Sequence, residues 1–112
     1  MFNPMEMMGK LKEMQAEMEK AKSMLDDITV TAEAGGGLVK VTANANRKVL
    51  KIDIDPTLMV PADKEMVEDL VTAAVNIALE KADETAREEI SKVTANYAPK
   101  IPGFDLGNFT GK

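Results

Sequence analysis

The fold is decided by residues 28–54, which read ITVTAEAGGGLVKVTANANRKVLKIDI. Apolar and polar residues alternate over three short runs, and this period of two is typical of strands with one buried face. Three consecutive glycines, residues 35–37, separate the first run from the second, and Asn46-Arg47 separates the second from the third. Both breaks suit tight turns. The stretch therefore predicts a three-stranded antiparallel sheet meander over residues 28–34, 38–45 and 48–54.

The same alternation predicts the two faces of the sheet. The third strand would bury Leu50, Ile52 and Ile54. The polar face would carry three cations on one side of the sheet: Lys40, Arg47 and Lys51. Another part of the chain must cover the apolar face.

A helix is predicted on each side of this sheet in the sequence. Asn3-Pro4 is a typical helix start, and the apolar spacings that follow predict a long N-terminal helix over residues 4–25. Pro61 and Asp63 begin a long C-terminal helix, predicted over residues 64–96, whose broad apolar stripe suits packing on the sheet. The fold class is therefore α+β, with a single domain over residues 1–98. Residues 99–112 contain Pro and Gly and are predicted to be a flexible tail, with docking on a partner as the alternative.

The first helix carries a heptad seam of apolar residues. The expected dimer-interface residues on it are Met7, Leu11, Met14, Met18 and Leu25. A small sheet cannot cover a seam of this length, so we expect a helix–helix contact between two copies of the chain, a homodimer. The alternative is a helix that packs only on its own fold.

Composition excludes several classes of function. The chain has 112 residues and contains neither Cys nor His, which removes the usual ligands of zinc and the commonest general base. Residues 35–37 lack the GK[ST] ending of a phosphate-binding loop, and Asp53 and Asp55 have no further carboxylates near them in the sequence. We therefore expect no catalytic residue, no metal, no cofactor and no small-molecule substrate. A membrane partner is not expected either, because no apolar run approaches the ~18 residues of a membrane helix.

The charge balance is acidic. The chain has 14 basic and 19 acidic residues, a net charge of −5, which argues against a simple cationic DNA-coating protein. The candidate phosphate contacts on rigid predicted elements are Lys10, Lys12, Lys20, Lys22, Lys40, Arg47 and Lys51. Taken alone, these residues look more like ordinary solubilising charge, and they permit a nucleic-acid surface without indicating one.

Several strings of residues occur together in an order that is specific. They are Met14-Gln15, residues 35–42 (GGGLVKVT), 52–58 (IDIDPTL), 63–71 (DKEMVEDLV), 73–76 (AAVN) and 102–104 (PGF). In this order they resemble the YbaB/EbfC family of bacterial nucleoid-associated proteins over nearly the whole chain. The resemblance implies a long N-terminal helix, a three-stranded antiparallel sheet and a C-terminal helix.

The resemblance also implies a function. It implies a tweezers-like homodimer, not an enzyme, that binds double-stranded DNA with little sequence dependence. A location in the cytoplasm at the nucleoid, and a role in nucleoid organisation or gene regulation, are part of the same expectation. The alternative function is a protein-interaction module that uses the Met-rich helix seam and does not bind DNA.

Overall fold

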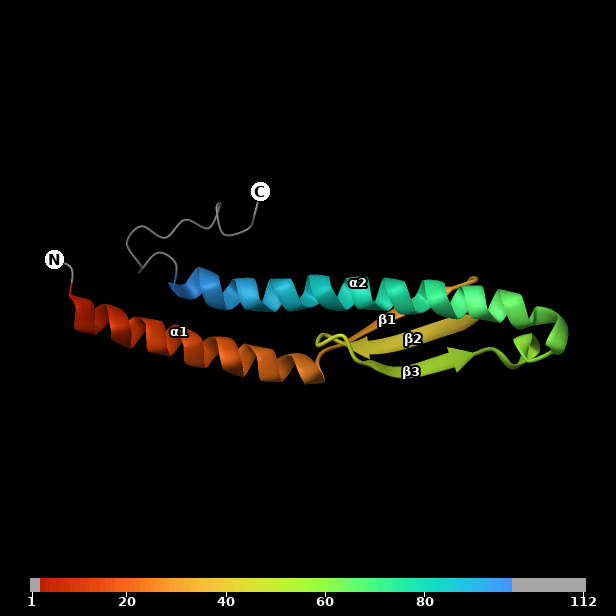
Figure 1. Cartoon of the computed structure of the whole chain (residues 1–112), viewed down its shortest axis with the longest axis horizontal. Coiled ribbons are helices and arrows are strands. Elements are labelled where there is room, and N and C mark those ends of the chain that lie inside the picture. Colours follow the sequence, from red (N-terminus) through yellow and green to blue (C-terminus); the bar gives the residue numbers. More distant parts are fainter. Residues whose placement is uncertain (1–2, 98–112) are drawn as a thin grey trace. The chain divides into compact units, whose positions relative to one another are not determined.

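The computed structural model describes residues 3–97. Helix α1 (Pro4–Met24) is followed by a single 3-10 turn, η1 (Leu25–Asp27), and then by the strands β1 (Thr29–Ala34), β2 (Val39–Asn44) and β3 (Val49–Ile54). Two more 3-10 turns, η2 (Pro56–Leu58) and η3 (Pro61–Asp63), lead into helix α2 (Lys64–Tyr97), as Figure 1 shows. The predicted α+β class and the predicted order of elements are confirmed. The predicted tail, residues 99–112, lies outside the described residues.

The chain forms two compact units, which we describe separately. The central unit comprises Met24–Ala86 and contains the sheet and the first part of α2. The helical unit comprises the chain up to Ser23 and from Arg87 on. The prediction of a single domain over residues 1–98 stays a prediction.

The sheet of the central unit is antiparallel, with the strand order β1-β2-β3. Gly35, Gly36 and Gly37 join β1 to β2 with φ values of 66°, 66° and 95°. L side chains rarely adopt this conformation, so glycine is needed here and the predicted glycine turn is confirmed. A Cβ atom at Gly35 would lie 3.0 Å from Cδ1 of Leu70 on α2. The turn therefore also packs closely against the helix.

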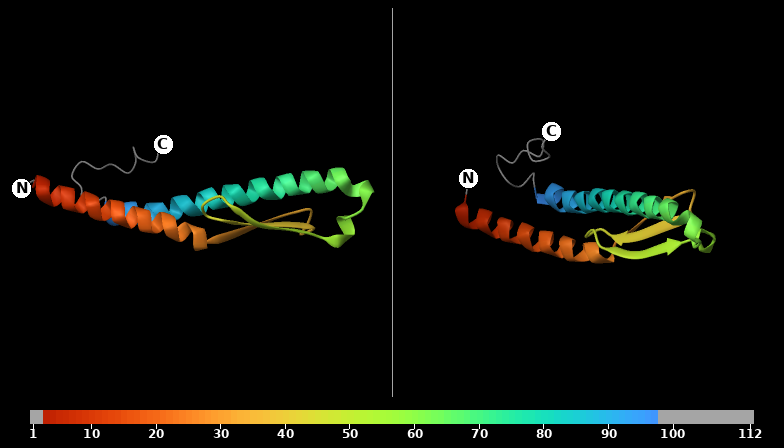
Figure 2. Two further views of the ribbon diagram at one scale, coloured as in Figure 1. Left: turned by 60° about the horizontal axis from the view of Figure 1, so that its bottom comes forward. Right: turned by 45° about the vertical axis from the view of Figure 1, so that its right-hand side comes forward.

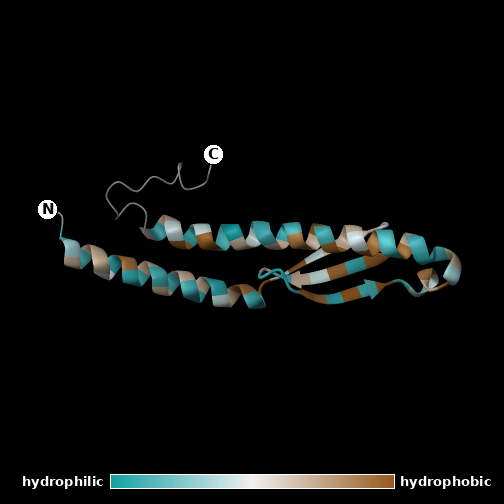
Figure 3. Cartoon of the chain, in the orientation of Figure 1, coloured by the Kyte–Doolittle hydropathy of each residue, from teal (hydrophilic) through white to brown (hydrophobic). Residues whose placement is uncertain are grey.

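One apolar core holds α2 on the sheet. Its buried members are Ala32, Val39, Val41, Ala43, Leu58, Ala74 and Ala78. Ala74, Ala78 and Ala82 lie four residues apart on one face of α2 and are completely buried, and their small side chains let the helix approach the strands closely. Within the central unit, Figure 2 shows α2 running along one face of the sheet. Figure 3 shows apolar residues on all the strands and along α2.

The third strand departs from the predicted burial. Leu50 is 54% exposed and Ile52 is 42% exposed, so the prediction that β3 buries both is wrong; Ile54 does pack against the core. The pairing explains Leu50: Thr42 pairs with Lys51 and Ala43 pairs with Val49, which leaves Leu50 unpaired in a bulge. Ile52 lies opposite the buried Val41. It remains exposed because the core under α2 is centred on β1 and β2.

Helix α1 belongs to the helical unit up to Ser23. It begins as predicted, because Oδ1 of Asn3 accepts a 3.0 Å hydrogen bond from the backbone N–H of Met5. No residue of α1 is buried. The half-buried residues follow the predicted seam and are Met7, Met14, Met18 and Ala21. Within residues 3–97, neither helix is long and apolar enough to cross a membrane.

Candidate nucleic-acid interface

The charges of the chain are segregated by element. Helix α2 carries four basic and eight acidic residues, a net charge of −4. Residues 29–54, the strands and their turns, carry four basic and two acidic residues, a net charge of +2. Helix α1 carries four of each sign and is neutral. The surplus of acid therefore lies mainly on α2, and the sheet segment is locally basic.

Two predicted cations, Lys40 and Lys51, lie on the polar face of the sheet. Lys40 stands on the middle strand, paired with Glu33 on β1 and with Asp53 on β3. Its Nζ atom is 3.6 Å from Oε1 of Glu33, and Nζ of Lys51 is 3.4 Å from Oδ1 of Asp53. Both ion pairs are exposed, and exposed pairs are weak. Each lysine can therefore exchange its carboxylate for another anion at little cost.

The third predicted sheet cation, Arg47, lies elsewhere. It sits in the loop between β2 and β3, and its Nη1 atom donates to both carboxylate oxygens of Asp83 on α2, at 2.9 and 3.1 Å. Helix α2 covers the apolar face of the sheet, so the prediction that Arg47 shares the polar face with Lys40 and Lys51 is wrong. The reason is that the chain has already left the ladder at Asn44, and the strand alternation does not extend through the loop.

The loop itself is firmly anchored. The backbone N–H of Arg47 donates to the carbonyl of Asn44 at 3.0 Å, and the side-chain Oδ1 of the buried Asn44 accepts from the N–H groups of Asn46 and Lys48 at 2.9 and 3.1 Å. Nδ2 of Asn46 donates to Oδ1 of Asp26 in η1 at 2.7 Å. These bonds hold the loop in one conformation. Sequence reasoning missed Lys48, because the alternation of the third strand places it on the same face as Leu50 and Ile52.

The candidate lysines of α1 do not form one basic stripe. Within the described residues, Lys10, Lys12 and Lys20 form no ion pair and are exposed. At 100° per residue they point in different directions around the helix, as does the fourth candidate, Lys22. The structure therefore places Lys40 and Lys51 together on the sheet face, sets Arg47 apart beside α2, and leaves the α1 cations dispersed.

The carboxylates that could suggest other chemistry are engaged separately. Asp53 pairs with Lys51, whereas Asp55 caps η2 and accepts from the backbone N–H and the Oγ1 of Thr57, at 2.9 and 2.6 Å. These hydrogen bonds hold the pKa of Asp55 below its ordinary value. Among the described residues, no group of three or more His, Cys, Asp or Glu side chains could hold a metal ion.

The chain matches a known family over most of its length. Residues 1–97 match the YbaB/EbfC DNA-binding family. Similar proteins include a nucleoid-associated protein of Anaeromyxobacter sp. (strain Fw109-5), 47% identical over 87% of this chain and 92% of that protein. One from Bordetella avium is 48% identical over 89% and 91% of the two chains, and one from Chlorobium phaeobacteroides is 50% identical over 91% and 93%.

A solved structure shows the same fold. The crystal structure of an uncharacterized protein from Helicobacter pylori matches with a TM-score of 0.68 at 24% sequence identity. The match covers 79% of this chain and 92% of that chain. The α+β architecture described above is therefore shared with an experimentally determined structure.

Proposed function

The chain belongs to the YbaB/EbfC DNA-binding family of nucleoid-associated proteins, which is not an enzyme family, and we propose that it binds duplex DNA as a homodimer, mainly through the phosphates. The observation that carries the proposal is the segregation of charge, since the sheet segment has a net charge of +2 while α2 holds the acids. The chain has one Tyr and no Trp, so few aromatic side chains are available to stack on bases. A location at the nucleoid, and hence in the cytoplasm, and a role in nucleoid organisation or gene regulation belong to this proposal. The family match does not favour the alternative of a protein-interaction module.

Binding through exposed ion pairs gives a definite salt dependence. The cations of the sheet face, Lys40 and Lys51, would exchange a neighbouring carboxylate for a phosphate, and the DNA would release its condensed counterions. Because non-specific binding is mostly this counterion release, affinity falls steeply with salt. We expect weak binding with little dependence on base sequence.

A gel-shift titration with two unrelated duplexes at three salt concentrations tests this function. We expect similar affinities for the two duplexes and a linear fall of the logarithm of the binding constant with the logarithm of salt concentration. Absence of any shift at ~50 mM salt, where non-specific binding is favoured, would contradict the proposal.

A homodimer is supported by the uncovered apolar surface of β3. The outer edge of β1 is occupied at one point by Lys81, whose Nζ donates to the carbonyl of Thr31 at 2.8 Å. The outer edge of β3 has no neighbouring strand among the described residues, and three apolar side chains along it are exposed: Val49, Leu50 and Ile52. An apolar, unpaired edge strand is a template for pairing with another chain.

The sequence of β3 is complementary to itself. Two copies paired antiparallel about Ile52 would place Lys51 of one copy opposite Asp53 of the partner subunit. A second, separate contact proposed between the two copies uses four seam residues of α1: Met7, Leu11, Met14 and Met18. Leu25 lies in η1 and is only 4% exposed, so we leave it out of this surface.

Charge exchange on β3 tests the pairing. Light scattering after size exclusion should show a dimer of the 12.1 kDa chain. Lys51→Glu alone and Asp53→Lys alone place like charges opposite each other and should weaken the dimer, whereas the double exchange should restore it. Replacing Met14 and Met18 with Glu tests the α1 surface in the same assay. A wild-type monomer at micromolar concentration would refute the dimer, and a double exchange no better than the singles would refute the β3 register.

A further inference from the structure

The loop between β2 and β3 holds an arginine in an unfavourable conformation. Arg47 has φ of 65°, and within residues 3–97 it is the one residue other than glycine with positive φ. Arg47 is the third residue of a three-residue hairpin loop that starts at Ala45. Such loops usually carry glycine at this position. An L side chain there costs conformational energy that glycine would avoid. The loop therefore carries a large cationic side chain at a position where glycine, which has no side chain, would be more stable.

The anchoring of this loop fixes where its cations lie. Oδ1 of Asn44 accepts hydrogen bonds from within the loop, and Nδ2 of Asn46 donates one to Asp26 of η1. Lys48 is adjacent to Arg47, is exposed, and forms no ion pair with any described residue. Because the backbone of the loop is already fixed, binding an anion has to order only the side chains of these two cations.

The partner of Arg47 is held loosely. Both oxygens of Asp83 accept from the same nitrogen, Nη1, so the other N–H groups of the guanidinium take no part in the ion pair. The side chains of Arg47 and Asp83 are 57% and 40% exposed. An exposed carboxylate bound to one corner of a guanidinium can be displaced by a backbone phosphate, which offers a similar pair of acceptor oxygens and carries the same single negative charge.

We propose that Arg47 and Lys48 form a phosphate-binding site for the DNA backbone, and that Asp83 competes with the phosphate for Arg47. This inference rests on the proposed DNA-binding function. A phosphate on Arg47 must displace Asp83, because the two anions repel each other at contact distance. Asp83 thus sets the affinity of the loop for DNA, and removing its charge raises that affinity.

Three variants of the full chain in the gel-shift assay test the proposal. Asp83→Asn should tighten binding about two- to fivefold, the fold-change that corresponds to releasing an exposed ion pair, and also remove a nearby repulsion. Arg47→Gln and Lys48→Gln should each weaken binding and lower the salt slope by about 0.9. In the background of Arg47→Gln, the effect of Asp83→Asn should shrink.

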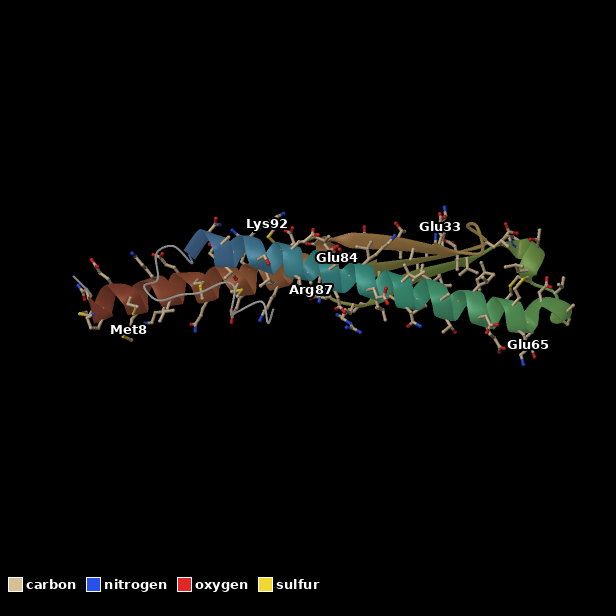
Figure 4. The ribbon with its side chains drawn as sticks, turned by 90° about the horizontal axis from the view of Figure 1, so that it is seen from above. Met8, Glu33, Glu65, Glu84, Arg87 and Lys92 are labelled. Carbon is tan, nitrogen blue, oxygen red and sulfur yellow. The ribbon has the colours of Figure 1, made fainter. Side chains whose placement is uncertain are left out.

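Glu84→Gln is the matched control. Glu84 follows Asp83 on α2, is exposed, and forms no ion pair with any described residue, so its replacement changes the net charge by the same amount without releasing Arg47. It is labelled with other charged side chains in Figure 4. Equal effects of Asp83→Asn and Glu84→Gln, or weaker binding by Asp83→Asn, would overturn the competition. Wild-type affinity in both loop variants would overturn the site while leaving DNA binding intact, whereas no wild-type shift would refute the DNA-binding function itself.

Discussion

Two adjacent glycines of the β1–β2 turn allow a controlled test of how closely α2 packs on the sheet. Gly35 and Gly36 have the same φ of 66°. A Cβ atom at Gly35 would lie 3.0 and 3.1 Å from the two Cδ atoms of Leu70, whereas a Cβ atom at Gly36 would meet nothing within 4 Å. Gly35→Ala and Gly36→Ala therefore impose the same backbone strain, but only Gly35→Ala creates a steric conflict with Leu70.

The magnitudes follow from these two terms. Left-handed backbone costs an L residue roughly 1–2 kcal/mol, and the reduced entropy of the unfolded chain returns about 0.4–1 kcal/mol. Gly36→Ala should thus lower the free energy of unfolding by about 1 kcal/mol. Gly35→Ala must also move Leu70 off its rotamer, at a further cost of order 0.5–1.5 kcal/mol. Its total should be about 2 kcal/mol.

Urea and thermal unfolding followed by circular dichroism measure the difference. For a chain of this size, 1 kcal/mol shifts the melting temperature by roughly 4–8 °C. Adding Leu70→Ala should remove the excess cost of Gly35→Ala, which a double-mutant cycle reports as a coupling of about 1 kcal/mol. Equal destabilisation by the two alanines, or no coupling to Leu70, would show that the turn does not pack against α2 as described.

Other perturbations have equally definite outcomes. Val41→Ala should lower the free energy of unfolding by about 2 kcal/mol, because it removes two buried methyl groups and leaves a cavity; denaturant unfolding checks this. Asp55→Asn should flatten the acid limb of the stability curve: the folded pKa of Asp55 is lowered, so its contribution is present above the ordinary pKa and is lost as pH falls through the folded value. Melting temperatures at pH 6 and pH 3 measure this change. Gln at Lys10, Lys12 and Lys20 should reduce the salt slope of DNA binding by about 0.9 for each lysine that contacts a phosphate, and an unchanged slope would remove α1 from the interface.

The elements that sequence reasoning predicted well are those encoded by neighbouring residues. Asn3 caps α1, and Pro61 and Asp63 precede α2, so the beginnings of both helices could be predicted from one turn of sequence. The glycine turn is equally local, because glycine alone tolerates three consecutive positive φ values at no steric cost. The burial of Ala32, Val39, Val41 and Ala43 followed from alternation, because α2 covers their face, whereas the burial of Asn44 did not.

The errors arose where a residue's environment depends on a distant part of the chain. The bulge at Leu50 depends on the pairing between β2 and β3. The extra residue in β3 means that residues before Leu50 point to the opposite face from the one that simple alternation predicts. The ion pair of Arg47 with Asp83 joins residues 36 apart, which no spacing rule connects. The exposure of Ile52 depends on where α2 crosses the sheet, and this is decided by which helix face carries the alanines.

The acidic net charge is a poor guide to binding because α2 concentrates it. Salt screens charges beyond roughly 8 Å at physiological ionic strength, so a phosphate near the sheet responds to the side chains around it and not to the whole chain. The sheet segment has a net charge of +2, and within the described residues Asp83 is the one acid of α2 that forms an ion pair with it. Within the described residues the other seven acids of α2 form no ion pair with the sheet segment, whereas at the proposed site Asp83 would act on a phosphate at contact distance and be screened little. If the proposed site binds DNA, raising the salt concentration should weaken its phosphate contacts, and the Asp83–Arg47 ion pair should decide how readily Arg47 is available to a phosphate.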